Sequence, residues 1–323
     1  MKRLELSDWP AMAAGLRRPH QAAFYAMYSS LYDAIVTDPV LMLVPLDDHL
    51  VHRGDGVFEA LKLIDGRYYN LQAHLERLEH SARAIGLPLP RPLAAIRDIA
   101  VETGRAGGRR DGTLRIFISR GPGGFSVNPY ECPAPQLYVV VTAAGTPFMQ
   151  AHPSGARLKS SAVPAKTGGM AAIKNCNYVP NVLMKKEALD AGVDFTVGFD
   201  ERGCMTEGAT ENIGIVSDGG RLLFPSLDRI LAGTTMLRVM ALAERLVADG
   251  LITGVGNADI PKAALRSARE VLLTGTTINV TAAIALDGQP IGDGKPGPIY
   301  RALSAMLAED MRRNTDLLTQ VSE

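Results

Sequence analysis

The sequence is poor in cysteine. Its 3 cysteines, Cys132, Cys176 and Cys204, are scattered along the chain and are too few for a disulfide framework or a zinc cage, so reduced thiols are expected. The 6 histidines show no His-Glu-x-x-His or comparable ligand spacing. We therefore expect no metal site, and the chemistry must come from other groups.

Net charge and long apolar runs are also missing. The chain has 34 Lys and Arg against 34 Asp and Glu, and thus a formal net charge of +0 at pH 7. A neutral chain has no long-range attraction for polyanions, which argues against nucleic acid and acidic membrane surfaces as partners. No stretch is long and apolar enough to span a bilayer, and residues 1–20 lack the apolar core of a signal peptide. We therefore expect a cytoplasmic protein with no membrane partner.

The composition is that of a globular protein with room for two domains. Of its 323 residues, 46% are hydrophobic and 21% are charged. Residues 146–156 lie in a stretch rich in Gly, Pro and small residues, and are predicted to be a linker between domains at 1–145 and 157–323. Helical and strand patterns mingle without steady βαβ alternation, which favours an α+β fold.

Local patterns predict several elements of the first domain. Residues 21–35 carry apolar groups at helical spacing and are predicted to form an extra N-terminal helix. Asp65 and Gly66 stand between two strand-like runs, which is a strong hairpin signal. The runs TLRIFIS and QLYVVVT are typical of strands and are expected to pair with each other.

Lys174 differs from the other lysines in its surroundings, because it follows Ala-Ala-Ile and precedes the turn-prone Asn-Cys-Asn. Most lysines are simply solvated. A partly dry site, however, lowers the pKa of an amine, so that more of it is a neutral nucleophile able to form a Schiff base with a carbonyl. Such a lysine is most useful with pyridoxal 5'-phosphate, whose ring acts as an electron sink.

That cofactor makes further demands, and the sequence offers a candidate for each. Glu207, among small and polar residues, is a carboxylate for the ring nitrogen, and Arg77 is a guanidinium able to fork a phosphate. Thr234 and Thr235 open a predicted helix, whose first N–H groups suit a phosphate, and Thr276 offers a hydroxyl. Each also has an ordinary explanation as a solvated charge, a helix cap or a strand turn.

Six segments occur in order along about residues 45–300: HRGDGVFEALKL, HLERLEHSA, IKNCNYVPNVLMKKEA, TEGATENIGIV, ILAGTTMLRVMALA and LLTGTTINVTA. Together they resemble the class IV, or fold-type IV, pyridoxal-phosphate enzymes, which include branched-chain aminotransferases, D-amino-acid aminotransferases and aminodeoxychorismate lyase. The resemblance implies a two-domain fold, with the cofactor cleft between a smaller N-terminal α/β domain and a larger C-terminal domain. It also implies a homodimer.

The resemblance assigns roles where residues match. Lys174 in Ile-Lys-x-x-Asn is similar to the family's Schiff-base lysine, and Glu207 in Thr-Glu-Gly-Ala to its ring-nitrogen carboxylate. Tyr178 resembles a tyrosine near the phenolate oxygen of the cofactor, although it lies one residue closer to the lysine than in the branched-chain enzymes.

The phosphate site of the family also has matching residues. Arg77 in His-Leu-x-Arg-Leu resembles the phosphate arginine, and Thr234 and Thr235 resemble the phosphate cup at a helix start. Thr276 is similar to the hydroxyl of the strand turn that completes this cup.

The substrate pocket of neither aminotransferase branch is reproduced. The branched-chain enzymes use a Tyr-x-Arg pair where this chain has Thr113-Leu114-Arg115, and the Arg-x-His of the D-amino-acid enzymes is missing from the later loop. The candidates for gripping a substrate carboxylate, directly or through a turn N–H, are His52, Arg53, Arg115, Arg120 and Thr277.

We therefore expect a transaminase that moves an amino group between a small amino acid or amine and a 2-oxo acid through a lysine Schiff base. One alternative is a 4-amino-4-deoxychorismate lyase on the same fold, but the lyases generally carry a threonine where this chain has Ala60. Another is a non-catalytic pyridoxal-phosphate-binding homologue, which the joint presence of Lys174 and Glu207 disfavours. The sequence leaves open the handedness and side chain of the substrate.

Overall fold

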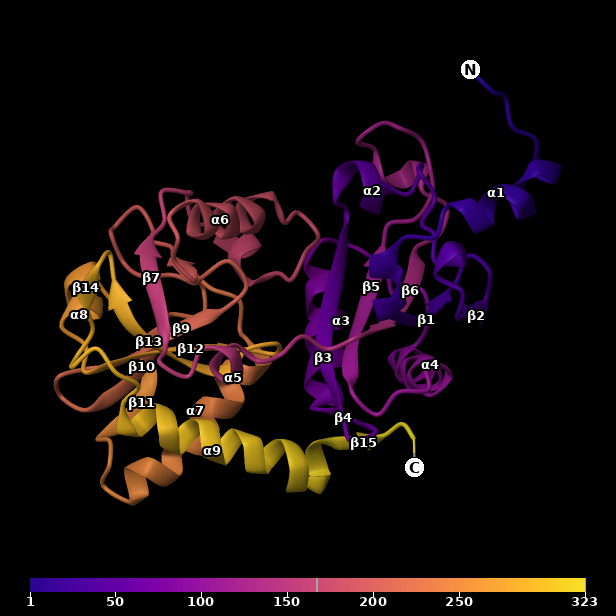
Figure 1. Ribbon diagram of the computed structural model, residues 1–323. Coiled ribbons are helices and arrows are strands. Elements are labelled where there is room, and N and C mark those ends of the chain that lie inside the picture. The colour runs from indigo at the N-terminus through magenta and orange to yellow at the C-terminus, as the bar shows by residue number, and fades with distance from the viewer. Residues whose placement is uncertain (167, 323) are drawn as a thin grey trace. The chain divides into compact units, whose positions relative to one another are not determined.

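The computed structural model describes residues 1–166 and 168–322, which divide into two compact units (Figure 1). The first unit contains Met1–Ala144 and the C-terminal residues from Leu317 onward. The second unit contains Gly145–Asp316. Each unit is built around its own sheet, and the expected α+β fold, in which helices and strands mingle, is confirmed.

The first unit contains a seven-stranded antiparallel sheet in the order β15-β4-β3-β5-β6-β1-β2. Its strands are β1 (Phe24–Ser29), β2 (Ala34–Val36), β3 (Gly56–Ile64), β4 (Arg67–Tyr69), β5 (Gly112–Ser119), β6 (Gln136–Thr142) and β15 (Leu318–Gln320). Its α-helices are α1 (Trp9–Gly15), α2 (His49–Arg53), α3 (Leu71–Ala84) and α4 (Leu93–Ala106).

Two local predictions for this sheet are confirmed. Asp65 and Gly66 connect β3 to β4 with φ values of 50° and 75°, the left-handed conformation that a tight hairpin turn requires. The runs TLRIFIS and QLYVVVT form β5 and β6, which pair along their whole length.

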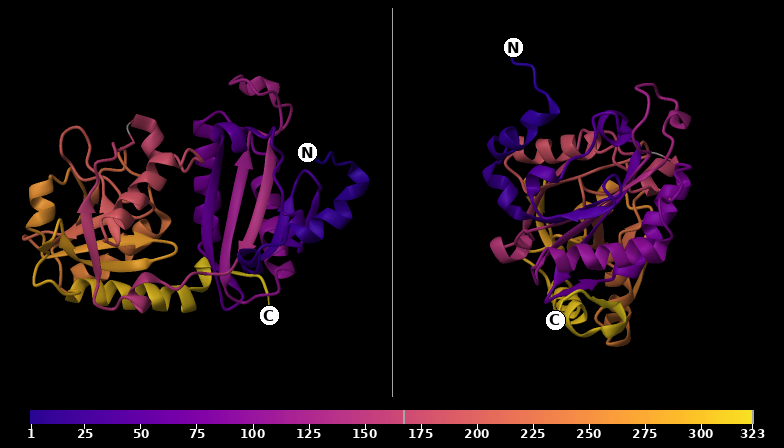
Figure 2. Two further views of the ribbon diagram at one scale, coloured as in Figure 1. Left: turned by 45° about the horizontal axis from the view of Figure 1, so that its top comes forward. Right: turned by 90° about the vertical axis from the view of Figure 1, so that its right-hand side faces the viewer.

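One face of this sheet is covered by α3 and α4 (Figures 1 and 2). Leu61, Leu114 and Val141 lie side by side across β3, β5 and β6 on this face, and each is 0% exposed. Glu59 lies on the same face and is also 0% exposed, which makes it the unusual charged member of an apolar layer.

The expected helix at 21–35 is wrong. The structure has β1, the turn after it and β2 there, and β1 pairs with β6 through partners such as Met27 with Val140 and Tyr28 with Val139. The apolar spacing fits a helix or a buried strand, and the aromatic residues favour the strand once a partner strand is available.

The second unit contains an eight-stranded mixed sheet, with the path β11-β10-β9-β12-β13-β7-β8 and one strand off that path. Its strands are β7 (Ala156–Ser160), β8 (Phe195–Val197), β9 (Asn212–Val216), β10 (Arg221–Pro225), β11 (Gly254–Ala258), β12 (Glu270–Gly275), β13 (Asn279–Leu286) and β14 (Gln289–Pro290). Its α-helices are α5 (Phe148–Ala151), α6 (Val179–Asp190), α7 (Thr234–Ala248), α8 (Lys262–Arg266) and α9 (Pro298–Arg313).

The helices of the second unit pack against its sheet at two places. α7 and α9 lie side by side (Figures 1 and 2) and pack against β12. α6 packs against β8 at the other end of the sheet. Most residues of the candidate site lie in three segments of this unit: the loop before α6, the loop before α7, and the connection from β8 to β9.

The unit boundaries differ from the expected ones in two places. Residues 146–156 do not form a separate linker, because Phe148 of α5 packs edge-on against Phe195 of β8 with ring centroids 5.0 Å apart. The C-terminus does not stay in the second unit, because β15 returns to pair with β4 of the first. Among the helices that the structure describes, none is long and apolar enough to cross a membrane.

Candidate active site

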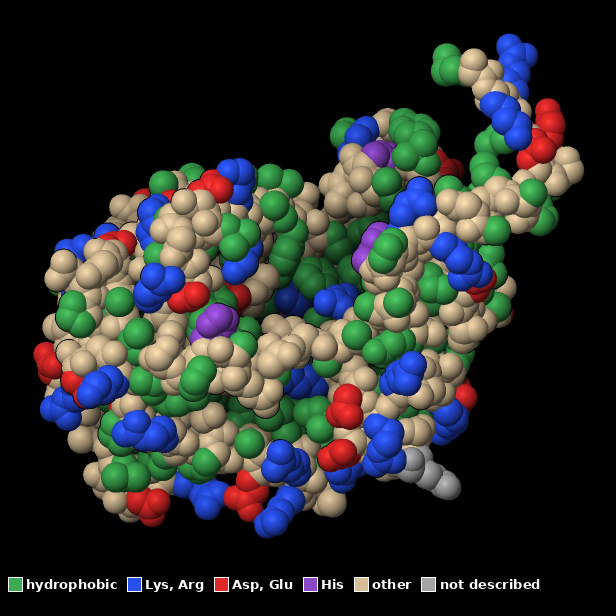
Figure 3. Space-filling model, in the orientation of Figure 1, with side chains coloured by type: hydrophobic (Ala, Val, Ile, Leu, Met, Phe, Trp, Pro, Cys, Tyr) green, Lys and Arg blue, Asp and Glu red, His purple; other side chains and the backbone are tan. Residues whose placement is uncertain are grey.

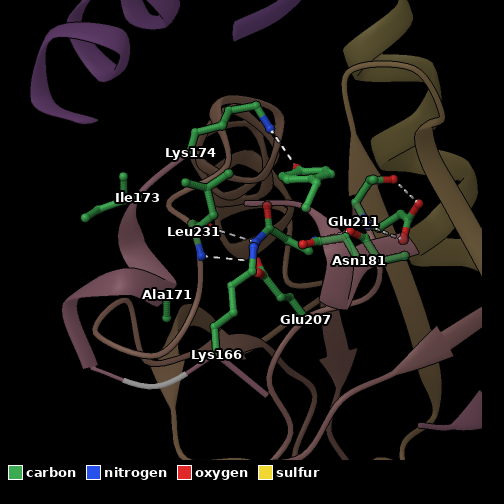
Figure 4. A pocket seen from close by; sticks show the side chains of 12 residues that line it. Lys166, Ala171, Ile173, Lys174, Asn181, Glu207, Glu211 and Leu231 are labelled. Carbon is green, nitrogen blue, oxygen red and sulfur yellow. Dashed lines mark hydrogen bonds between the residues drawn. The ribbon is translucent and has the colours of Figure 1, made fainter. Parts of the chain in front are cut away.

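Lys174 lies in the short loop between a 3₁₀ helix (Gly168–Ala172) and α6. The preceding Ile173 is 7% exposed and anchors this loop in the core of the second unit. The Nζ atom of Lys174 donates a hydrogen bond to the hydroxyl of Tyr178 at 3.4 Å (Figure 4). Because Tyr178 is the N-cap residue of α6, the start of the helix fixes the position of the lysine amine.

Glu207 faces the same pocket from the connection between β8 and β9 (Figure 4). Its carbonyl oxygen accepts from the N–H of Gly198 at 3.0 Å, and its Oε2 atom accepts from the N–H of Leu231 at 3.1 Å. Burial raises the pKa of this carboxyl group, and nearby Glu211 adds to the rise. The Leu231 N–H and the ammonium groups of Lys166 and Lys174 act in the opposite direction.

The pocket brings together residues from four segments of the second unit. It is lined by Lys166, Ala171, Ile173, Lys174, Tyr178, Asn181, Glu207, Ala209, Thr210, Glu211, Asn212 and Leu231. Two amines and two carboxyl groups therefore share one small hollow with apolar walls. Such a concentration of partly or fully buried ionisable groups is typical of a functional site.

The loop before α7 is fixed to this pocket. The side chain of Asn212 donates from Nδ2 to the carbonyl oxygen of Leu231 at 2.8 Å, and Gly233 packs directly on the same side chain. Gly233 is the N-cap residue of α7 and offers no side chain to cap the helix, whose first turn has no acidic residue. Thr234 is buried and Thr235 is half-buried in this first turn. A helix start of this kind suits an anion.

The turn between β12 and β13 also reaches the pocket lining. A Cβ atom on Gly275 would lie 3.7 Å from the carbonyl oxygen of Thr210, which lines the pocket. Thr276 is half-buried in this turn and Thr277 is exposed. The turn thus lies next to the pocket wall, and the contact of both threonines with a ligand stays a prediction.

Arg77 lies on α3 in the first unit and binds Glu59 through two parallel hydrogen bonds. Its Nε and Nη2 atoms donate to the two carboxylate oxygens at 2.7 Å and 2.8 Å. His74 contacts the same carboxylate through Nδ1 at 2.6 Å. Arg77 is 12% exposed, so its fork holds a buried carboxylate in this structure, and its role toward a phosphate stays a prediction.

The arginines expected to bind the substrate carboxylate have defined partners in the first unit. Arg120 donates from Nε and Nη2 to Asp55, both at 2.9 Å, and Arg53 donates to the carbonyl oxygens of His52 and Phe125. These two guanidinium groups hold loops together.

Arg115 and His52 have different surroundings. Arg115 donates from Nη1 to Thr142 Oγ1 at 2.9 Å, and burial lowers the pKa of its guanidinium group. The ring of His52 stacks on that of Phe125, with centroids 4.9 Å apart. Arg120 is paired with Asp55 and Arg53 is exposed, whereas Arg115 is half-buried and donates to a neutral hydroxyl, so Arg115 is the most suitable of the three arginines for an anion.

Sequence reasoning missed several residues of the pocket. Lys166 lies in the Gly- and Pro-containing stretch before Lys174, and no motif points to it. Asn181 and Glu211 lie inside the motifs that contain Tyr178 and Glu207, so the period of α6 and the turn before β9 were the available signals. In the part of the chain that the structure describes, no cluster of His, Cys, Asp and Glu could hold a metal ion.

Comparison with known proteins places this geometry among the aminotransferases. Residues 56–285 match the family model for amino-transferase class IV. The chain is 40% identical over 290 residues to a chloroplastic D-amino-acid transaminase of Arabidopsis thaliana, covering 90% of this chain and 77% of that protein. It is 29% identical over 260 residues to a putative branched-chain-amino-acid aminotransferase of Methanocaldococcus jannaschii, covering 80% of this chain and 88% of that protein.

A solved structure gives the same result for the fold. The T.th. branched-chain amino acid aminotransferase, complexed with N-(5'-phosphopyridoxyl)-L-glutamate, matches with a TM-score of 0.83 and 26% identity. The match covers 93% of this chain and 99% of that chain. The expected fold type is confirmed by this likeness.

Proposed function

This chain belongs to the class IV aminotransferases and is a transaminase of fold type IV, and we propose that Lys174 is the residue through which it moves an amino group. The donor is a small amino acid or amine, and the acceptor is a 2-oxo acid. The observation that carries this proposal is the shared pocket of Lys174, Tyr178 and Glu207. The family implies pyridoxal 5'-phosphate as cofactor.

The residues of the pocket fit that cofactor. Glu207 supplies a carboxylate, Tyr178 a hydroxyl and Lys174 an amine in one hollow, and the N-cap of α7 beside it is a glycine without a capping side chain. When bound, pyridoxal phosphate supplies an aldehyde that bonds an amine and a ring that withdraws electrons from the carbon bearing that amine. Arg77, Thr234, Thr235 and Thr276 are our proposed phosphate-binding residues.

Each side chain then has a defined task. Lys174 would hold the cofactor through its amine, and once a substrate amine takes its place it would move the proton from the substrate Cα to the former aldehyde carbon, a role commonly worth about a hundredfold or more in rate. Glu207 binds the protonated ring nitrogen, which strengthens the electron withdrawal. Tyr178 accepts a hydrogen bond from Lys174, and we propose that its hydroxyl also contacts the phenolate oxygen.

Borohydride trapping tests the central assignment. Reduction of the cofactor-loaded protein followed by peptide mapping should place the phosphopyridoxyl group on Lys174, and Lys174→Ala should lose both the adduct and the half-reaction with amino donors. Lys186→Ala is the matched control, because Lys186 lies on the exposed side of α6, paired with Asp190. An adduct on any other lysine would contradict the proposal.

A half-reaction screen tests whether the protein uses D- or L-amino acids as donors. One relative is named for D-amino acids and another for branched-chain amino acids, so their names give no single choice. We propose Arg115 as the first candidate for the substrate carboxylate, with His52, Arg53, Arg120 and Thr277 as the others. The screen mixes loaded protein with D- and L-amino acids and chiral amines, and the loss of the cofactor's visible band identifies the donors.

We also propose that the protein is a cytoplasmic homodimer. An apolar tip formed by Phe125, Val127 and Tyr130 on the first unit supports the dimer, since these side chains are 61%, 82% and 92% exposed. Figure 3 shows hydrophobic side chains gathered at this end of the unit, near α2. Exposed apolar residues that cluster in this way are typical of an interface. Light scattering on the purified protein tests the dimer, and cell fractionation tests the location.

A further inference from the structure

Lys166 is a second amine in the pocket, and the proposed chemistry does not use it. It lines the same hollow as Lys174 and Glu207, and Figure 4 shows the side chains of Lys166 and Glu207 directed into it. Its Nζ atom lies 5.0 Å from the centroid of the Tyr178 ring. The Nζ atom of Lys174 lies 5.9 Å from the same centroid, so two ammonium groups share one aromatic ring.

The surroundings of Lys166 suit a cation. The Tyr178 ring attracts an ammonium group through its π face. Asn181 lines the pocket, is 6% exposed, and its Oδ1 atom has no hydrogen-bond partner among residues 1–166 and 168–322. Burial lowers the pKa of Lys166, while the carboxylate of Glu207 opposes that effect. The aromatic ring and the nearby anion therefore offset part of the cost of keeping this amine charged.

This arrangement mainly affects the ionisation of Glu207. Burial and Glu211 both favour its neutral form, and the groups that favour the carboxylate are the Leu231 N–H, Lys166 and Lys174. Lys174 has another proposed task, because its amine would hold the aldehyde carbon of the cofactor. Arg229 lines a neighbouring hollow with Glu207, but it is engaged with Asp200. Among the described residues that line the pocket, Lys166 is then the cation that the proposed chemistry leaves to Glu207.

We propose that Lys166 is a positioning residue that keeps the Glu207 carboxylate ionised, so that the pocket selects a ligand with a protonated ring nitrogen. The identity of that ligand rests on the proposed function, whereas the effect of Lys166 on Glu207 is argued from the pocket itself. In the alternative hypothesis, Lys166 merely competes with the ring nitrogen for Glu207. The two hypotheses predict opposite changes in ligand affinity when Lys166 is removed.

The first test measures Glu207 itself in the protein without cofactor. The carboxyl carbon of Glu207 is followed by ¹³C NMR as the pH is varied, with Glu207→Gln used to assign the signal. Lys166→Met should raise the pKa of Glu207, and Lys166→Arg should leave it close to that of the wild type. Lys185→Met is the matched control, because Lys185 makes a similar cation–π contact, at 5.5 Å from the Phe195 ring, outside the pocket. An unchanged Glu207 titration in Lys166→Met overturns the inference.

The second test measures binding of 4-deoxypyridoxine 5'-phosphate, which has the ring and the phosphate but no aldehyde. Lys166→Met should bind it about tenfold more weakly at acidic pH and should regain affinity as the pH rises and Glu207 ionises. Tighter binding by Lys166→Met at every pH would show a merely competing cation. Because the probe cannot bond Lys174, the result does not depend on whether borohydride trapping succeeds.

Discussion

Tyr178 is the residue whose hydroxyl and ring have separable effects. Its hydroxyl accepts from Lys174 at 3.4 Å, while its ring faces the ammonium groups of Lys166 and Lys174. Tyr178→Phe removes only the hydroxyl. Since a hydrogen bond contributes about 1 kcal/mol, we expect the turnover rate constant to fall about five- to tenfold, as measured in steady-state assays. Tyr32→Phe, at a residue 45% exposed and outside the pocket, is the control. An unchanged rate would show that the hydroxyl has no role in the reaction.

Single residues of the pocket were predictable where the signal is local. Lys174 and Tyr178 lie four residues apart in one segment, and Glu207 lies in a short polar motif, so that sequence alone brought these residues to attention. Lys166 was not predictable, because its place beside Tyr178 depends on how the loop before α6 folds back. The fork of Arg77 on Glu59 was equally hidden, since it joins a helix to a strand across the core of the first unit.

At the scale of elements, the start of α7 depends on a glycine. A Cβ atom on Gly233 would lie 1.9 Å from Oδ1 of the buried Asn212, whose side chain holds Leu231. Gly233→Ala should therefore displace the loop before α7, destabilise the protein by about 1–3 kcal/mol, and weaken cofactor binding. Equilibrium denaturation and cofactor titration measure the two effects.

The control for this change is another glycine in a turn. At Gly219 the nearest atom to an added Cβ lies 3.9 Å away, so Gly219→Ala should be close to neutral. If Gly233→Ala lost stability without losing cofactor affinity, the start of α7 would have no part in binding.

The elements themselves were predictable to different degrees. The hairpin at Asp65 and Gly66 was predictable because its turn residues determine a local conformation. Residues 21–35 were not, since the partner of β1 is β6, far along the chain, and the apolar spacing alone fits both structures.

For the whole molecule, acid should weaken both units through one carboxylate in each. Burial acts to raise the pKa of Glu59, but Arg77 and His74 outweigh it and lower the pKa from 4.5 to about 2. At Asp287, burial again acts to raise the pKa. Ser160 and Lys262 outweigh it and lower the pKa from 3.8 to about 2. Because both folded values lie below the unfolded ones, this stability is present above about pH 4.5 and is lost as the pH falls toward about 2.

Thermal unfolding followed by circular dichroism from about pH 6 to about pH 2.5 measures this loss. Glu59→Gln should be about 3–5 kcal/mol less stable near neutral pH, because Arg77 and His74 lose their charged partner in a buried place. The same variant should show a smaller further loss in acid. Equal acid sensitivity of Glu59→Gln and the wild type would exclude this carboxylate as a source of the pH dependence.

The return of the chain to its first unit joins the ends of the sequence in one sheet, which no local pattern predicts. β15 pairs with the short strand β4, and Val321, 1% exposed, donates its N–H to the carbonyl oxygen of Gly66 at 2.9 Å and accepts from Arg105 at 3.1 Å. A chain that ends at Asp316 should therefore expose β4 as a sheet edge and aggregate more readily. Val321→Ala keeps the backbone pairing and should cost about 1–2 kcal/mol from the lost apolar contacts.

Denaturant unfolding of Val321→Ala against the exposed Gln320→Ala measures the packing of this segment, and light scattering of the truncated chain measures the aggregation. The two results separate packing from pairing, since Val321→Ala leaves the β4 edge covered. If truncation left both solubility and stability unchanged, β15 would not contribute to the stability of the first unit.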